Sequence, residues 1–308
     1  MTTAVLFPGQ GSQYAGMADP WVKHDSGRAV VEQASEVMGL DLVVSCRDDA
    51  MLATTEFAQP ALFACDLASF AVLDAEGAVV EAAAGHSLGE FAALVAAGVL
   101  DLAAALRVVV ERGRAMQAAS DERPGTMTAL IGLSAEEGAH MCEVAGRGDV
   151  LQVANENGPK QVVLSGSIEA IERAEEQARS RGARAIRLQV AGAFHSPLMD
   201  PAVERMRAVL SEIEFREPRF PVVANVSGKM ISEPSALRDL LARHVVSPVR
   251  WQRSMQTLGR AGFDTFVEAG PGDVLSKLVR RIVPGARAVP IGSPEDAKAF
   301  AAGAERLA

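Results

Sequence analysis

Cysteines and long uncharged apolar runs are scarce in this sequence of 308 residues. Its three cysteines, Cys46, Cys65 and Cys142, are odd in number and scattered, without a CxxC pair. This pattern argues against a disulfide framework and against a structural zinc site, so we expect buried free thiols and no metal. The apolar segment 4–7 is too short for a signal-peptide core, and no stretch approaches the length of a membrane span without a charge. We therefore expect a cytoplasmic protein that does not associate with membranes.

Positive charge is also in deficit. The sequence has 30 lysines and arginines against 39 acidic residues, a formal net charge of −9, which argues against nucleic-acid binding. Between residues 250 and 287, however, seven basic residues stand against three acidic ones. Either this region receives an acidic partner, or its charges only solvate helix faces. The candidates for docking such a partner are Lys277, Arg280 and Arg281.

Apolar residues, by contrast, are plentiful: they make up 49% of the sequence, enough for a large core. Strand-like runs at 4–7 and 78–84 alternate with helical patterns such as the amphipathic segment 59–73. This alternation favours an α/β domain built on a mostly parallel sheet.

The order of elements changes between residues 126 and 190. Ser134 and Glu137 have the spacing of a capping box and open one helix, and a second helix is expected at 168–181. Four strand-like runs accompany these helices, at 126–131, 150–154, 161–164 and 185–190. The resulting βαββαβ order is that of a ferredoxin-like unit.

Glycines flank this unit at Gly125 and Gly192 and suggest hinges at its two ends. We therefore predict a small ferredoxin-like domain, 125–191, inserted into a large domain that is formed by 1–124 and 192–308.

The sequence GHSLGE, residues 85–90, contains a GxSxG pattern centred on Ser87. A strand-like run precedes it and a helical segment follows it. This is the context of a nucleophilic serine, because glycines at both positions leave room for a sharp elbow. We predict that Ser87 is a nucleophile and that the amide of Leu88 points toward a developing oxyanion. The alternative is a glycine-rich turn with an incidental serine.

A serine hydroxyl needs a base to take its proton, and the sequence has five histidines. His195, in AGAFHSPLM, lies on an expected loop, where catalytic groups are often found. His86 should point away from its neighbour Ser87, and His24 and His140 lie in polar surroundings. No aspartate before His195 has an evident role, so we expect a backbone carbonyl to orient its ring. A purely structural histidine remains the alternative.

Arg112 falls on the apolar stripe of a helix that begins near Asp101, and no carboxylate lies three or four residues from it. An arginine turned toward the core needs an anion, because an unpaired buried charge is unfavourable and the guanidinium stays protonated. Two interpretations remain. Either the carboxylate of a ligand pairs with Arg112 through two parallel hydrogen bonds, or the side chain extends to the surface.

The stretch LFPGQGSQ, residues 6–13, places two glycines directly after a strand-like run. Such turns offer backbone N–H groups to a ligand, which is often a phosphate. A P-loop would need a lysine followed by serine or threonine, and a dinucleotide site would need a third glycine where this sequence has Tyr14. The amides of this turn are therefore offered to a group other than those phosphates.

Six segments together resemble the malonyl-CoA:acyl carrier protein transacylases and, more broadly, the acyltransferases of fatty-acid and polyketide synthases. They are LFPGQGSQ, GHSLGE, ERGRAMQ, AFHSPLM, SPVRW and EAGPGDVL, in the order and spacing of that family from about residue 6 to residue 282. The resemblance implies an α/β-hydrolase-like large domain with an inserted ferredoxin-like domain. It also implies that Ser87 is acylated, that His195 is its base and that Arg112 binds the free carboxylate of the malonyl group.

By the same resemblance, the backbone N–H groups of Gln10 and Leu88 form an oxyanion hole, so the glycine-rich turn approaches a developing alkoxide. Phe194 is similar to the phenylalanine of relatives that take malonyl, whereas a serine there often accompanies methylmalonyl. One position departs from the family. Many relatives have a glutamine whose main-chain carbonyl orients the histidine, and this sequence has His244. A main-chain role survives that change, and the imidazole can add a titrating group near the site.

The function implied is transfer of malonyl from malonyl-CoA to the phosphopantetheine thiol of an acyl carrier protein. It proceeds through a malonyl-serine intermediate, without a metal or redox cofactor, and we expect a monomer. One alternative is a discrete, trans-acting polyketide synthase acyltransferase that uses malonyl or alkylmalonyl units. Another is a thioesterase or editing hydrolase, which would not need Arg112. A docking module without catalysis is disfavoured because Ser87, His195 and Arg112 are all present.

Overall fold

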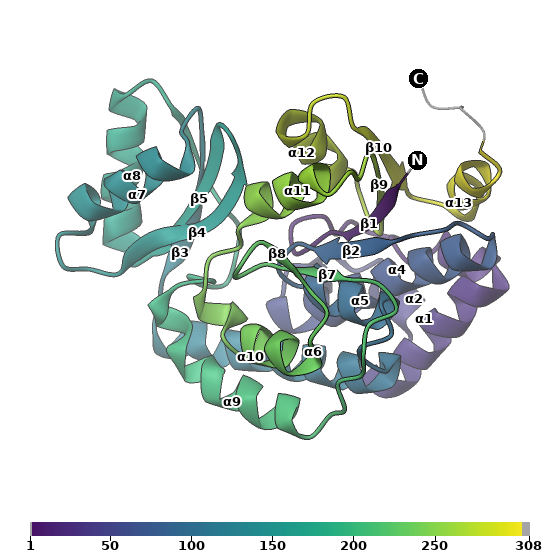
Figure 1. The fold of residues 1–308 in the computed structure, drawn as a ribbon. Helices are drawn as coiled ribbons and strands as arrows, with labels where there is room; N and C mark the ends of the chain where they lie inside the picture. Colours follow the sequence, from purple (N-terminus) through teal and green to yellow (C-terminus); the bar gives the residue numbers. More distant parts are fainter. Residues whose placement is uncertain (1, 304–308) are drawn as a thin grey trace.

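The computed structural model describes residues 2–303 and has an α/β architecture with two sheets (Figure 1). The larger sheet has six strands in the order β10-β9-β1-β2-β7-β8. Its pairs are parallel except for β7 and β8, so the predicted mostly parallel sheet is confirmed. The strands of this sheet are β1 (Thr3–Phe7), β2 (Ala82–Gly85), β7 (Val222–Ala224), β8 (Lys229–Ile231), β9 (Thr265–Ala269) and β10 (Arg287–Ile291).

Helices cover both faces of this sheet. Successive side chains of a strand point to opposite faces, so Val5 and Phe7 of β1 enter one core while Ala4 and Leu6 enter a second. The second core is closed by α11 (Trp251–Arg260) and α12 (Val274–Ile282), above the sheet in Figure 1. The other helices of the large unit are α1 (Asp25–Met38), α2 (Leu42–Ser45), α3 (Asp49–Leu52), α4 (Thr55–Ala75), α5 (Gly89–Ala96), α6 (Leu102–Glu122), α9 (Asp200–Ser211), α10 (Pro234–Ala242) and α13 (Pro294–Ala301), with short 3₁₀ turns at η1 (Trp21–Lys23), η2 (Pro197–Met199) and η3 (His244–Val246).

Helix α4 corrects one expectation. The segment 59–73 is helical as predicted but not amphipathic, because α4 packs against α1, α5, α6 and β9 and is buried nearly all round. Among residues 2–303 it is also the one helix with the length and hydropathy of a membrane span. Since 89% of the relevant window is buried inside the fold, packing in the core accounts for that composition.

The smaller sheet is antiparallel, with strand order β4-β5-β3-β6. Two helices pack on it, and the predicted βαββαβ order of elements is observed. The capping box of Ser134 and Glu137 is confirmed at the start of the first helix. The elements are β3 (Thr126–Ile131), α7 (Ala135–Gly146), β4 (Leu151–Gly158), β5 (Gln161–Gly166), α8 (Ile168–Ser180) and β6 (Arg184–Arg187).

Two strands are shorter than expected. β2 begins at Ala82 and not at residue 78, because only its last residues pair with β1 and β7. β6 ends at Arg187 and not at residue 190, because its paired register with β3 ends there.

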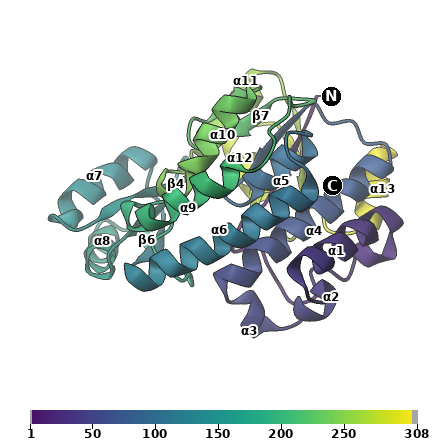
Figure 2. The same ribbon diagram turned by 90° about the horizontal axis from the view of Figure 1, so that it is seen from below.

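The two units are joined by more than their connecting chains. Val249 of the large unit bonds to β4, donating to the oxygen of Ala154 at 2.8 Å and accepting from the amide of Glu156 at 2.9 Å. The glycines at the boundaries are tightly packed: a Cβ at Gly125 would lie 2.7 Å from Ala193, and one at Gly192 would lie 2.0 Å from Ser120. Close packing, more than hinge freedom, therefore explains these glycines. Figure 2 shows α6 running from the large unit toward the small one.

Candidate active site

Ser87 lies in a sharp turn between β2 and α5, with a φ of 51° in the left-handed region. Close backbone approach explains both glycines of the pattern. A Cβ at Gly85 would lie 1.9 Å from the carbonyl carbon of Gly89, and one at Gly89 would lie 2.1 Å from the carbonyl oxygen of Phe7. The predicted strand, turn and helix are confirmed, and they hold Ser87 beyond the carboxyl end of β2.

The hydroxyl of Ser87 lies 2.8 Å from Nε2 of His195. On the other side of the ring, Nδ1 lies 3.0 Å from each of the main-chain oxygens of His244 and Ser247. Because a carbonyl oxygen only accepts, Nδ1 carries the proton and Nε2 is free to accept one from the serine. The structure thus puts backbone carbonyls, including the expected one of His244, where other serine enzymes have a carboxylate.

The surroundings of His195 keep its ring neutral. The residue is 3% exposed, has a φ of 58°, and donates its amide to the oxygen of Val245 at 2.9 Å. Burial lowers the pKa of His195 to about 3, and the charge of Arg112 acts in the same direction, while the two carbonyls oppose them. At neutral pH the ring is therefore in the state that can take a proton.

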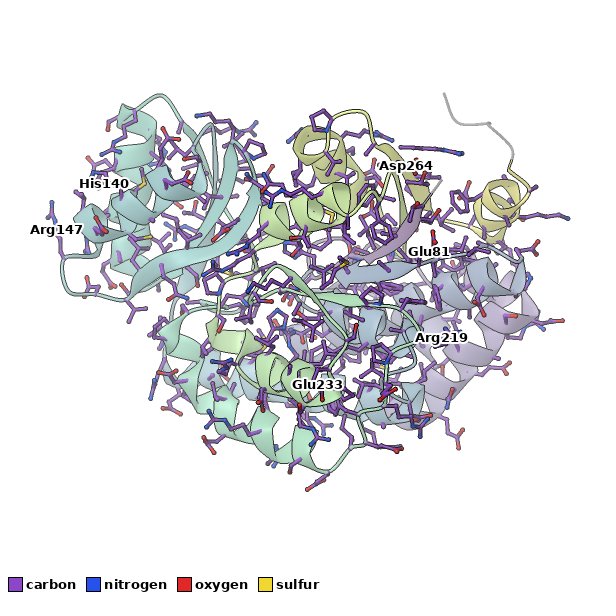
Figure 3. All side chains as sticks on the ribbon, in the orientation of Figure 1. Glu81, His140, Arg147, Arg219, Glu233 and Asp264 are labelled. Atoms are coloured by element: carbon purple, nitrogen blue, oxygen red, sulfur yellow. The ribbon has the colours of Figure 1, made fainter. Side chains whose placement is uncertain are left out.

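Three other histidines are engaged elsewhere. Nε2 of His86 lies 2.8 Å from Oδ1 of Asn157, so its ring bonds away from Ser87. The side chain of His24 caps α1. His140 lies on the outer end of the small unit, with its side chain 60% exposed (Figure 3). None of these three is placed to take the serine proton.

Arg112 lies on α6 and is 1% exposed, so its side chain does not extend to the surface. Its Nη2 lies 3.2 Å from the hydroxyl oxygen of Ser87, and its Nη1 donates to Oε1 of Gln59 at 2.5 Å. Burial lowers the pKa of Arg112 to about 10, and the charge of Glu90 opposes this. The guanidinium thus remains protonated at neutral pH, next to the nucleophile, with a neutral amide as its hydrogen-bond partner. This arrangement suits recognition of an anion.

The glycine-rich turn after β1 packs directly on the Ser87 elbow. A Cβ at Gly9 would lie 2.4 Å from the carbonyl oxygen of His86, so only glycine permits this approach. The side chain of Gln10 is anchored by Thr55 and Gln59, at 3.3 and 3.5 Å. Within residues 2–303, the backbone N–H groups of Gln10 and Leu88 have no hydrogen-bond acceptor. An oxyanion hole requires such unpaired amides, and these two come from turns that pack directly on each other.

Two further predicted residues lie against the base. Phe194 precedes His195 and is buried, at 5% exposure. The ring of His244 lies 5.2 Å from that of His195, tilted by 49°. Burial, together with the nearby His195 and Arg112, lowers the pKa of His244 well below its usual value, so it adds a neutral ring and not a second charge.

The predicted docking residues do not join this site. Lys277, Arg280 and Arg281 are exposed on α12, and Lys277 pairs with Asp273 at 2.8 Å. Arg281 lies 3.4 Å from Oε1 of Gln161 on β5, so this surface reaches the junction of the two units.

Sequence reasoning missed three residues around Ser87 and His195. Gln59 holds Arg112, and its only signal was a polar residue within an apolar helical run. Asn225 and Glu90 hold the elbow itself. Glu90 lies within the GHSLGE segment, but no task was assigned to it, and Asn225 had no signal because it is 138 positions from Ser87 in the sequence.

The fold that holds this serine, histidine and arginine is that of an acyltransferase domain. The model of the acyl transferase domain matches residues 5–302, so the chain belongs to this family, and the expected resemblance is confirmed.

Relatives from several bacteria match over most of the chain. The malonyl CoA-acyl carrier protein transacylase of Escherichia coli K12 is 41% identical over 91% of this chain and 92% of its own. The protein of that name from Bacillus subtilis 168 is 37% identical over 95% of this chain and 94% of its own.

Solved structures agree. The transacylase of Coxiella burnetii superposes with a TM-score of 0.95 at 36% identity, covering 98% of this chain and 97% of that one. A malonyl-transacylase solved in complex with its type II polyketide synthase acyl-carrier protein has a TM-score of 0.95 at 37% identity. The match covers 98% of this chain and 100% of that one.

Proposed function

We propose that this chain transfers a malonyl group from malonyl-CoA to the phosphopantetheine thiol of an acyl carrier protein. The observation that carries the proposal is the buried Arg112 cation, 3.2 Å from a serine hydroxyl that is itself 2.8 Å from a neutral histidine. The relatives named malonyl CoA-acyl carrier protein transacylase support it. Arg112 selects a carboxylate-bearing acyl group, because its charge has no anionic hydrogen-bond partner among residues 2–303.

In the first half-reaction, the Ser87 oxygen attacks the thioester carbonyl carbon while its proton passes to Nε2 of His195. The carbonyl oxygen becomes an alkoxide, which the amides of Gln10 and Leu88 stabilise; each such donor typically contributes about 100- to 1,000-fold in rate. The C–S bond then breaks, and CoA leaves as a thiol with the proton from His195. The product is a malonyl ester on Ser87.

In the second half-reaction, the phosphopantetheine thiol gives its proton to His195 and attacks the ester carbonyl. The C–O bond to Ser87 breaks, and the serine recovers the proton from Nε2. Protons and electron pairs balance with these two residues alone, so the reaction as written uses no redox cofactor and no metal. A thioester and a serine ester are close in energy, so the transfer is reversible.

The proposal extends to the domain organisation and the oligomeric state. We infer an α/β-hydrolase-like large domain, 1–124 with 192–308, and an inserted ferredoxin-like domain, 125–191, acting as a monomer. The antiparallel order β4-β5-β3-β6 supports the second assignment.

We propose that the exposed face of α12 that carries Lys277, Arg280 and Arg281 receives the acidic carrier protein. A neighbouring structure was solved with a type II polyketide synthase carrier protein bound to its transacylase. Charge reversal at Lys277 should raise the KM for the carrier protein and leave acylation by malonyl-CoA unaltered, because steering acts on encounter and not on chemistry. Equal loss in both half-reactions would contradict this assignment.

The experiment that tests the function is intact mass after separate incubation with malonyl-CoA, acetyl-CoA and methylmalonyl-CoA. We expect a stable malonyl adduct that an acyl carrier protein removes, and no adduct in Ser87→Ala. Turnover to free malonate without an acceptor would select the hydrolase instead. A preference for methylmalonyl would select a polyketide synthase acyltransferase for alkylmalonyl units.

A further inference from the structure

Asn225 is fully buried at the end of β7, and the proposed chemistry gives it no task. Its side-chain amide nevertheless spans the nucleophile elbow. Oδ1 accepts a hydrogen bond from the backbone N–H of Ser87 at 2.8 Å, and Nδ2 donates to the carbonyl oxygen of Gly85 at 2.6 Å. One side chain therefore bonds to the backbone on both sides of His86, across the sharpest part of the turn.

The elbow needs such support for two reasons. A left-handed φ is unfavourable for a residue with a side chain, and Ser87 adopts it because the surroundings hold it there. The turn also ends the β2 ladder, and a buried N–H or C=O left without a partner would destabilise this conformation. Both groups find their partners in Asn225.

Asn225 is itself fixed by the backbone. Its N–H donates to Oε2 of Glu90 at 3.1 Å, and its carbonyl oxygen accepts from the amide of Arg250 at 3.0 Å. Glu90 is 1% exposed and lies in the first turn of α5, the helix that starts at the elbow. The side chain and main chain of Asn225 thus contact both sides of the turn, on β2 and on α5.

The same stretch of chain holds the base. The carbonyl oxygens of His244 and Ser247 accept a hydrogen bond from Nδ1–H of His195. Three residues after Ser247, the amide of Arg250 donates to the main-chain oxygen of Asn225. The segment from Asn225 to Arg250 therefore contacts the nucleophile at one end and the base near the other. We therefore expect a displacement at Asn225 to change the geometry between Ser87 and His195.

We propose that Asn225 is a positioning residue that locks the Ser87 elbow in line with Nε2 of His195. The reaction it serves rests on the proposed function, whereas the contact with the elbow does not. It acts through the backbone and touches no substrate. Its removal should therefore lower the rate of acylation and spare the binding of malonyl-CoA, which depends on Arg112.

The test compares Asn225→Ala with a matched control, Thr257→Val. Thr257 also donates from a partly buried side chain to a backbone carbonyl, that of Gly228 at 2.7 Å, but within residues 2–303 it makes no hydrogen bond to Ser87 or His195. Four quantities are measured: the acylation rate by rapid quench and intact mass, the KM for malonyl-CoA, the labelling rate of Ser87 by a fluorophosphonate, and the unfolding midpoint. We expect Asn225→Ala to acylate and label about 100-fold more slowly, with little change in KM. Thr257→Val should keep the wild-type rates.

A second variant keeps the proposal testable if Asn225→Ala does not fold. Asn225→Leu keeps about the same volume but can neither accept from the Ser87 amide nor donate to the Gly85 oxygen, so slower acylation is again expected. A wild-type rate in either folded variant, or an equal loss in Thr257→Val, overturns the positioning role.

Fluorophosphonate labelling requires no malonyl group. Normal labelling of a wild type that gains no malonyl mass would refute the proposed function alone, and equal labelling of wild type and Asn225→Ala would refute the positioning role alone.

Discussion

Replacing Arg112 by alanine should change which acyl group the protein transfers. In the structure the guanidinium is buried beside the nucleophile and donates to Gln59 and to the Ser87 oxygen. A malonyl carboxylate would add two parallel charge-assisted hydrogen bonds, which an acetyl group cannot make. A hydrogen bond to a charged group contributes about 1.5–3 kcal/mol, so the loss of two amounts to about 3–6 kcal/mol.

That free energy predicts a loss of about 10²- to 10⁴-fold in kcat/KM for malonyl-CoA, since about 1.4 kcal/mol is a factor of ten. Most of the loss should be in KM, because the carboxylate is bound equally in the ground state and in the transition state. Acetyl transfer should be unchanged or faster. The assay is competition between malonyl-CoA and acetyl-CoA, with the adduct mass as readout.

The matched control is Arg107→Ala, on the same helix but exposed to solvent. It should leave both rates unchanged. If acetyl and malonyl transfer fall together in Arg112→Ala, the residue supports the nucleophile or the fold and does not bind the carboxylate. A malonyl rate equal to that of the wild type would refute the clamp outright.

Three other predictions concern the base, the acyl pocket and the core. With the pKa of His195 lowered to about 3, the pH profile of kcat/KM for acylation should show no acid limb near pH 6.5, and a midpoint there would contradict a buried neutral base. Phe194→Ser should relax discrimination against methylmalonyl-CoA by about 1–3 kcal/mol, the usual value of one methyl group, which competing substrates measure. Burial raises the pKa of Asp66 well above its usual value, so the folded state keeps a proton that the unfolded state releases, and this contribution to stability is lost as pH rises. Asp66→Asn should therefore raise the unfolding midpoint at pH 8 more than at pH 4, and an equal effect at both would contradict a protonated Asp66.

The sequence pointed to Ser87 and Arg112 because their signals are local. The GxSxG pattern, with a strand before it and a helix after it, pointed to Ser87. The apolar stripe of α6 put Arg112 on the core side of the helix but left open whether its side chain reaches the surface. The structure adds that these two side chains and His195 converge. The same local logic failed for α4, whose burial depends on the neighbours α1, α5 and α6 and not on its own period.

Residues that hold the site in place were beyond sequence reasoning. Gln59 is 53 positions from Arg112, and Asn225 is 138 positions from Ser87. A single sequence carries no signal that pairs residues so far apart. The orientation of His195 by a carbonyl was predicted because a suitable acid was lacking and because the family resemblance implies a main-chain role at His244. The second carbonyl, that of Ser247, depends on the path of the chain after η3, which has no periodic signal.

The clamp and the base are coupled electrostatically, and this coupling bears on substrate choice. The positive charge of Arg112 is the second cause, after burial, that lowers the pKa of His195. A carboxylate bound to Arg112 neutralises that charge, so a malonyl group should raise the basicity of the very residue that takes the serine proton. An acetyl group leaves the cation unneutralised and the base weaker. If Arg112 binds the carboxylate as proposed, selectivity for malonyl would have two sources at this residue, direct pairing and activation of His195 as the base. Arg112→Ala would remove the pairing and also the charge that lowers the pKa of His195. That is why acetyl transfer is expected to hold or improve in the same variant in which malonyl transfer declines.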